Sequence, residues 1–182
     1  MMTEAELINN CKKQHAASQK LLYDLYAAKM LSVCMRYINE KTEAEDILQE
    51  GFIKIFANII YFRSEGSFEG WMRRIIVNSA LSALKVKHLK FADNIDHHLN
   101  HSKVEPIVLD KIGAQEIFEM IRTLPNGYRV VFNLFAIEGY SHKEIAAMLN
   151  ITESTSRTQF LKARNALKEK FTTKHLMKVS NE

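Results

Sequence analysis

The stretch from Phe68 to His88, "FEGWMRRIIVNSALSALKVKH", most constrains the fold, because it is apolar on nearly every side of a helical wheel. A surface helix shows one apolar stripe, whereas a helix that is apolar all round must be packed on most sides. The chain therefore needs several other helices around this one. The apolar positions are Phe68, Met72, Ile75, Ile76, Val77, Ala80, Leu81, Ala83 and Leu84.

The remaining segments can supply those helices, and the sequence predicts an all-α protein. Six Gly and two Pro are too few for a turn-rich sandwich or barrel, and 47% apolar residues suffice for a core. Residues 19–38, 42–59, 114–124 and 128–138 have helical periodicity. We expect Thr42, with Glu45 three residues later, to cap the second of these segments, and Ser67 to cap the helix at Phe68.

Periodicity fades between Lys90 and Lys111, where the chain is polar and rich in histidine. We expect two small helical domains, residues 1–89 and 112–182, joined by a flexible linker at 90–111. A metal site at His97, His98 and His101 is the alternative to solvated linker histidines, and the lack of a cysteine or regular helix there favours the latter. We expect no metal and no cofactor.

The segment from Ser141 to Arg164 predicts a helix-turn-helix. Ser141 and Glu144 form a capping box, Asn150 tolerates the left-handed conformation that ends a helix, and Thr152 can cap the next one. On a wheel of the second helix, Phe160, Ala163 and Leu167 face the core, with Ser156 on the same side. The opposite side presents Thr158, Leu161, Lys162 and Asn165, flanked by Arg157, Arg164 and Lys168.

That outer face suits the major groove of DNA, because it mixes cations and hydrogen-bonding groups with Leu161, which could meet a thymine methyl. A solvated basic face is the alternative. The caps of the two helices, the helix spacing and the excess of cations favour DNA.

Two faces in the first half are ambiguous from periodicity alone. Leu48, Phe52, Ile55 and Ile59 should face the core, while Asp46, Gln49, Glu50 and Ile53 share another face that is either a protein interface or simply solvated. Trp71, Arg74, Asn78, Leu81 and Lys85 form a stripe that suits unstacked bases, although Trp71 could equally belong to the core.

Charge is unevenly distributed along a chain whose net charge is +4. Residues 71–90 carry five cations and no acid, residues 150–178 seven cations against two acids, and residues 38–50 five acids against Lys41. This pattern favours nucleic acid contacted twice and a separate basic protein partner. Cys11 and Cys34 lack metal spacing, and neither a signal peptide nor a run of about 20 apolar residues is present, so we expect a cytoplasmic protein.

The order of these pieces resembles the extracytoplasmic-function sigma factors, the two-domain branch of the sigma-70 family. The resemblance extends from about residue 18 to 171, through "DILQEGFIKIF", "FEGWMRRIIVNSALSAL" and "LPNGYRVVFNLFAIEGYSHKEIAAMLNITESTSRTQFLKARNAL". It implies a subunit that binds core RNA polymerase, through the clamp of the largest subunit and the flap, and directs initiation at promoter DNA. It also implies an anti-sigma factor as a partner, and no small-molecule substrate.

The resemblance also implies roles for individual residues. The polymerase-binding helix carries Asp46, Gln49, Glu50, Phe52 and Ile53. The loop 62–67 would capture a flipped base of the minus-ten element, so the residues that contact this element would be Phe62, Arg63, Ser64, Trp71, Arg74, Asn78 and Lys85. The residues that read the minus-thirty-five element would be Thr155, Arg157, Thr158, Leu161, Lys162 and Asn165.

Three other classes of protein remain as rivals. A stand-alone helix-turn-helix regulator would act as a dimer on a palindromic site. A nucleic-acid enzyme is disfavoured, since the chain has no Ser/His/Asp set, Gly-rich phosphate loop or carboxylate cluster against a basic groove. A module that only sequesters another protein is disfavoured by the two basic segments. We therefore expect no enzymatic activity.

Overall fold

The computed structural model describes residues 2–90 and 113–179, which belong to two compact units within residues 1–92 and 93–182. The described residues form helices and no strand, so the all-α prediction is confirmed. None of the helices in these ranges is long and apolar enough to cross a membrane. Residues 91–111 of the predicted linker, with His97, His98 and His101, lie outside the described residues.

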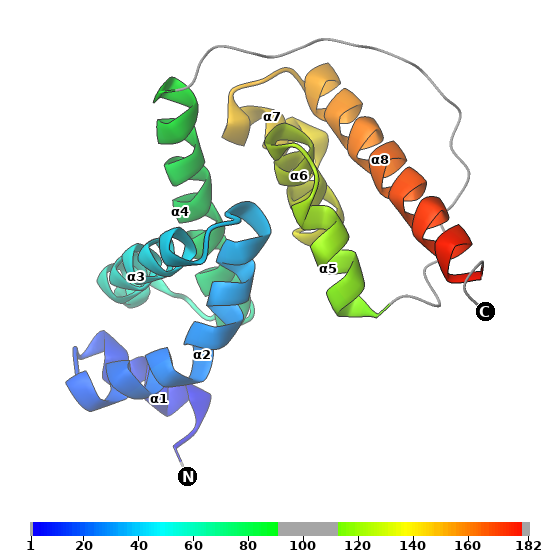
Figure 1. Ribbon diagram of the computed structural model, residues 1–182. Helices are drawn as coiled ribbons and strands as arrows, with labels where there is room; N and C mark the ends of the chain where they lie inside the picture. Colours follow the sequence, from blue (N-terminus) through cyan, green and yellow to red (C-terminus); the bar gives the residue numbers. More distant parts are fainter. Residues whose placement is uncertain (1, 91–112, 180–182) are drawn as a thin grey trace. The chain divides into compact units, whose positions relative to one another are not determined.

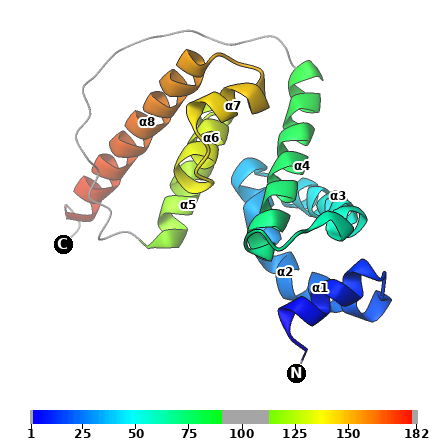
Figure 2. The same cartoon turned by 180° about the vertical axis from the view of Figure 1, so that it is seen from behind.

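The first unit is built on three helices that pack against one another in every pairing: α2, α3 and α4. Helix α1 packs against α2 and against a short 3-10 turn, η1, that follows α3 (Figures 1 and 2). The bounds are α1 (Glu4–Lys12), α2 (Ala16–Tyr37), α3 (Lys41–Asn58), η1 (Ile59–Tyr61) and α4 (Phe68–Lys90).

Helix α4 is packed on most sides, as its apolar sequence predicted. Met72, Ile76 and Ala80 are fully buried, and they meet the buried side chains of α2 and α3. Helices α3 and α4 come close together at Gly51, where a Cβ atom would overlap the side chain of Ile76. The absence of a side chain at Gly51 therefore sets how near α3 lies to the central helix.

The helix caps of this unit are partly as predicted. Ser67 caps α4, since its Oγ accepts a hydrogen bond from the Gly70 N–H at 3.1 Å. The predicted cap at Thr42 is wrong, because α3 begins at Lys41 and its cap is Glu40. The Glu40 carboxylate accepts from the N–H groups of Thr42 and Glu43 at 3.2 and 2.7 Å, so it satisfies two free donors at the positive end of the helix.

Within residues 113–179, the second unit forms four α-helices and a π-helical turn, with α6 and α7 packed on the long helix α8 (Figure 1). The bounds are α5 (Ala114–Arg122), α6 (Asn126–Phe132), a π-helical turn η2 (Asn133–Ile137), α7 (His142–Leu149) and α8 (Glu153–Val179). The break predicted at Pro125–Gly127 is shorter than expected, since α6 already begins at Asn126. The core contains Ile121, Leu124, Val131, Leu134, Ile145, Ala163 and Leu167.

The turn of the helix-turn-helix follows the predicted chemistry. Ser141 and Glu144 form the capping box of α7, and Asn150 ends this helix with φ 56° and ψ 47°. Thr152 caps α8, since its Oγ1 accepts from the Thr155 N–H at 3.0 Å. The left-handed residue and the two caps fix where α7 ends and where α8 begins.

Replacing Asn150 with alanine should lower the free energy of unfolding by about 1 kcal/mol, because alanine lacks the short polar side chain whose local hydrogen bonds let asparagine tolerate the left-handed conformation. Asn150→Gly is the matched control and should cost nothing, since glycine adopts this conformation freely. Thermal unfolding of both proteins, followed by circular dichroism, measures the difference. Equal midpoints for the alanine and glycine proteins would contradict a strained left-handed turn.

Candidate functional site

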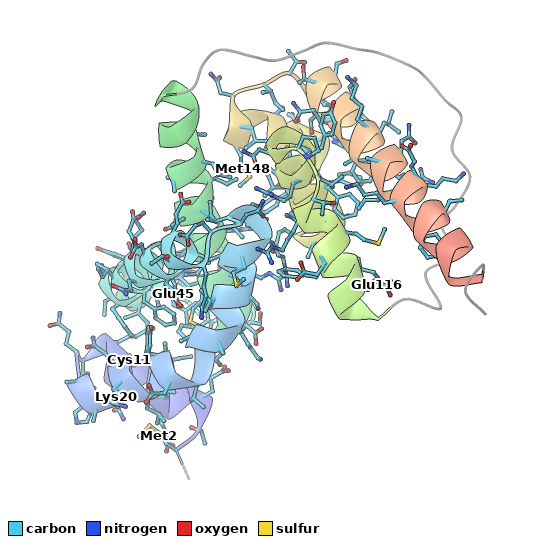
Figure 3. The ribbon with its side chains drawn as sticks, viewed as in Figure 1. Met2, Cys11, Lys20, Glu45, Glu116 and Met148 are labelled. Carbon is cyan, nitrogen blue, oxygen red and sulfur yellow. The ribbon has the colours of Figure 1, made fainter. Side chains whose placement is uncertain are left out.

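The outer face of α3 carries Asp46, Gln49, Glu50 and Ile53, all exposed, with 69% of Ile53 accessible. Glu45, labelled in Figure 3, marks this part of the helix. Phe52 does not lie on this face, because its side chain is only 3% exposed and its ring packs 4.7 Å from that of Tyr23 on α2. It holds α3 against the core from beneath, so the exposed face consists of the other four residues.

The two carboxylates on this face, Asp46 and Glu50, have different neighbours. Glu50 pairs with Lys54 one turn later at 2.6 Å, and Lys54 also donates to Ser79 Oγ on α4 at 3.2 Å. Lys54 therefore offsets part of the charge of Glu50 and leaves Asp46 as the more available carboxylate. This face therefore combines an exposed apolar side chain with carboxylates. A partner surface that carries an apolar patch beside a cation would complement it.

The loop between η1 and α4 is held at both ends. Phe62 is 7% exposed, in a ring cluster with Phe68 at 5.1 Å and Trp71 at 5.5 Å. Lys12 on α1 donates to the Phe62 carbonyl at 2.8 Å, and Ser67 caps α4 at the other end. Residues 63–66 between these anchors are exposed. Phe62 thus anchors the loop, while Arg63 and Ser64 stand at its surface.

The predicted stripe along α4 is not one continuous exposed face. Arg74, Asn78 and Lys85 are exposed, but Leu81 is 4% exposed and belongs to the core. Trp71 is half-buried, with its ring stacked on Phe68 at 5.6 Å. Trp71 therefore takes part in the core cluster and also borders the exposed loop, and its contact with unstacked bases stays a prediction.

On α8, the exposed face is centred differently from the wheel prediction. Arg157 is exposed and pairs with Glu153 one turn earlier, and Leu161 is 43% exposed. Thr155, Thr158, Lys162 and Asn165 are half-buried. The Lys162 ammonium lies 5.9 Å from the centre of the Tyr128 ring on α6, a cation–π distance that holds it toward α6. Arg157 and Leu161 are therefore the most prominent side chains.

Sequence reasoning missed a buried polar contact between the two helices of this motif. His142 Nδ1, on the first residue of α7, lies 2.9 Å from Ser156 Oγ on α8. The imidazole stacks on Phe135 at 4.2 Å, and it is 9% exposed, while Ser156 is fully buried. The wheel had put Ser156 on the core side, but nothing in the sequence identified its partner.

Burial and the nearby charge of Arg157 lower the pKa of His142 from its usual 6.5, with Glu153 acting in the opposite direction. The neutral ring is thus favoured in the folded protein, and this contribution to stability is lost as the pH falls from about 6.5 through the lowered pKa. Proton NMR should show one histidine that titrates below 6.5 and whose signal is absent from the His142→Asn protein. A pKa at or above 6.5 for that signal would contradict the buried site.

The described residues give no support for a metal site or for a reactive cysteine. The described parts of the chain contain no cluster of three or more His, Cys, Asp and Glu side chains that could hold a metal ion. Cys11 and Cys34 are both unbridged and buried, and burial raises the pKa of the Cys34 thiol to about 12. A thiol so rarely ionised is a poor nucleophile, and both cysteines serve as core side chains.

Two family models match the chain, one in each unit. Residues 22–88 match sigma-70 region 2, and residues 114–167 match sigma-70 region 4. The first match contains the α3 face, the loop and most of α4, and the second contains the helix-turn-helix. Together the two matches place the α3 face, the loop with α4 and the helix-turn-helix in regions of one protein family, which periodicity alone could not do.

Whole-chain relatives agree with this assignment. The RNA polymerase sigma-H factor of Pseudomonas aeruginosa is 27% identical over 177 residues, covering 90% of this chain and 91% of that protein. The ECF RNA polymerase sigma-E factor of Escherichia coli K12 is 28% identical over 181 residues, covering 93% and 94%.

A solved structure has a similar fold. The sigma factor RpoE of Bartonella quintana, in its complex with the anti-sigma factor NepR, matches with a TM-score of 0.50 and 19% identity, covering 82% of this chain and 94% of that one. The two family models occur in this order on a chain that its relatives match along nearly its whole length, and this favours a two-region sigma factor over a stand-alone helix-turn-helix regulator. The chain belongs to the sigma-70 family, as an RNA polymerase sigma factor of the extracytoplasmic-function type.

Proposed function

We propose that this sigma factor directs polymerase to promoters through three surfaces. One surface binds core polymerase, and the other two bind promoter DNA. Residues 1–89 act as region 2, residues 112–182 as region 4, and 90–111 join them. Sigma factors are non-catalytic initiation subunits, so binding and positioning are the whole of the activity. The observation that carries the proposal is that each family-matched unit presents an exposed face of the chemistry its role requires.

The α3 face is the proposed contact with the clamp of the polymerase largest subunit. Asp46 supplies an exposed carboxylate, and Ile53, at 69% exposure, supplies apolar area at the centre of the contact. Interfaces concentrate their binding energy in such central apolar groups, while the surrounding charges guide the approach of the partner. Gln49 and Glu50 add polar contacts, and Phe52 supports the helix from the core.

The loop and α4 are the proposed minus-ten surface. Arg63 and Ser64 stand on a loop anchored at both ends, and Arg74, Asn78 and Lys85 are exposed on the following helix. Unpairing a base costs a few kcal/mol, which contacts to the flipped base can offset. A loop whose ends are already fixed loses little further conformational entropy on binding, so more of the contact energy is available for strand opening.

Helix α8 is the proposed reader of the minus-thirty-five element. Arg157 and Leu161 are the exposed pair in its N-terminal part, with Thr155, Thr158, Lys162 and Asn165 beside them. An arginine can donate two hydrogen bonds to guanine, and leucine can contact a thymine methyl. The minus-ten and minus-thirty-five surfaces can each bind DNA weakly, because polymerase holds both surfaces on one DNA molecule. This raises the effective concentration of the second surface once the first has bound.

Further partners follow from the relatives. The core enzyme flap is a second expected polymerase contact, through region 4. An anti-sigma factor is an expected regulator, by analogy with the RpoE–NepR complex of Bartonella quintana. We propose the cytoplasm as the place of action, because core polymerase and promoter DNA are found there.

Gel shifts with and without core enzyme test this function against the dimeric regulator. A labelled promoter fragment should be shifted specifically by the chain together with core enzyme, and only weakly by the chain alone. The regulator hypothesis predicts the reverse, namely a specific dimeric complex on a palindromic site without polymerase. A specific shift that ignores core enzyme would therefore overturn the proposal.

A further inference from the structure

We propose that the buried hydrogen bond between His142 and Ser156 fixes the orientation of α8 on α7, and so sets how strongly the holoenzyme prefers promoters with a minus-thirty-five element. His142 is then a positioning residue that acts on DNA only through α8. This inference rests on the proposed function, since it assumes that α8 reads the upstream element.

The imidazole of His142 also has contacts outside α8. Its backbone opens α7 directly after the Ser141 capping box, in which the Glu144 side chain accepts from the Ser141 N–H at 2.8 Å. Its ring lies almost parallel to that of Phe135, with an interplanar angle of 11° and 4.2 Å between centroids. Since η2 and the start of α7 restrict where the ring lies, α8 has to align with Nδ1 for the hydrogen bond to form.

Helix α8 meets this ring at two places, one turn apart. Ser156 Oγ makes the hydrogen bond at 2.9 Å, and the Phe160 ring lies edge-on to the imidazole with centroids 5.9 Å apart. Phe160 also packs on Phe135 at 4.6 Å. Two contacts at i and i+4 on one face restrict both the rotation of α8 about its axis and its sliding along α7.

The contact lies beside the groups proposed to read DNA. Arg157 directly follows Ser156 in the chain, and Leu161 directly follows Phe160. A rotation of α8 that broke the bond to His142 would therefore turn Arg157 and Leu161 away from their present directions. Base readout by hydrogen bonds depends on such directions, whereas phosphate contacts are less sensitive to them.

A polar pair in this place is better explained by orientation than by stability alone. An apolar pair of similar volume could pack between α7 and α8 at little or no cost in stability, because it would need no hydrogen bond. Apolar surfaces are non-directional and tolerate small shifts, whereas a buried donor and acceptor are satisfied only in one arrangement. The pair thus specifies one arrangement of the motif.

The test uses full-length protein assembled with core polymerase. A promoter selected by the wild-type holoenzyme is compared with the same fragment carrying a scrambled upstream element, and the ratio of initiation rates gives the preference. His142→Phe keeps a ring to stack on Phe135 but removes the hydrogen bond. His142→Asn places an amide near the position of Nδ1 and can restore the bond. A His142→Phe, Ser156→Ala double variant replaces both partners with apolar groups.

The preference should fall about 3- to 10-fold in His142→Phe, the range expected for one buried hydrogen bond, and His142→Asn should retain most of it. The double variant should recover thermal stability relative to His142→Phe without recovering the preference. Full preference in the double variant would show that the pair serves packing alone, and equal losses in the Phe and Asn variants would assign the effect to the ring. Either result overturns the inference. A wild-type holoenzyme with no preference would instead overturn the proposed role of α8.

Discussion

Assembly with core polymerase should be strongly weakened in an Ile53→Asp protein. Ile53 is 69% exposed on α3, where it contributes nothing to the core of the free chain, so the substitution should leave the fold intact. At the centre of the proposed interface, a buried unpaired carboxylate should cost at least about 2 kcal/mol, which is roughly 30-fold in affinity. Titration of core enzyme with fluorescently labelled protein measures this loss.

Ile60 provides a matched control in the same unit. It is 56% exposed in η1, outside the α3 face, so Ile60→Asp makes the same chemical change at another exposed site. It should leave core affinity within about twofold, as expected for a surface change away from the interface. Asp46→Lys should weaken binding in the same direction as Ile53→Asp. Equal affinities for the Ile53 and Ile60 variants would show that the α3 face has been misassigned.

Recognition of the minus-thirty-five element should weaken by roughly 1–3 kcal/mol in Arg157→Ala, the range for a residue that contacts base edges. Lys162→Ala should have a smaller effect than Arg157→Ala, because Lys162 is half-buried against Tyr128. The measurement compares holoenzyme binding to promoters with intact and scrambled upstream elements. Unchanged selectivity in both variants would contradict the assignment of this face of α8.

Glu153→Gln is the control for this prediction. Glu153 pairs with Arg157 one turn earlier in the free chain, so the substitution releases Arg157 without removing it. Exposed ion pairs contribute little to stability, and the fold should therefore be unaffected. Promoter selectivity should be retained in Glu153→Gln. A loss as large as that in Arg157→Ala would mean that the ion pair, and not the free guanidinium, is what matters for recognition.

The parts of the structure that were predictable are those governed by local chemistry. Ser67, Ser141, Thr152 and Asn150 each act within a few residues of their own position, and each has the expected role. The cap of α3 was misassigned because Glu40 and Thr42 both lie near the start of the helix, and the sequence does not reveal which of the two lies just outside it. The buried stripe of α3 and η1, with Leu48, Phe52, Ile55 and Ile59, was also predictable, because the helical period places these side chains on one side.

Long-range contacts and side-chain directions could not be predicted in this way. The bond from Lys12 to the Phe62 carbonyl joins residues fifty positions apart, and the pairing of His142 with Ser156 depends on how α7 crosses α8. Resemblance to a family aligns positions but gives no direction to a side chain. Phe52 and Phe62 therefore matched family positions associated with binding, yet both are buried and support the exposed residues beside them.

Transcription in vitro tests the central claim most directly. Core polymerase from the organism that encodes the chain would transcribe a genomic DNA library with and without the protein, and the 5′ ends of the RNA would be mapped. The account predicts a set of defined start sites that appear only with the protein, share upstream and minus-ten elements, and disappear with Ile53→Asp but not with Ile60→Asp. An unchanged pattern of start sites on adding the wild-type protein would contradict it.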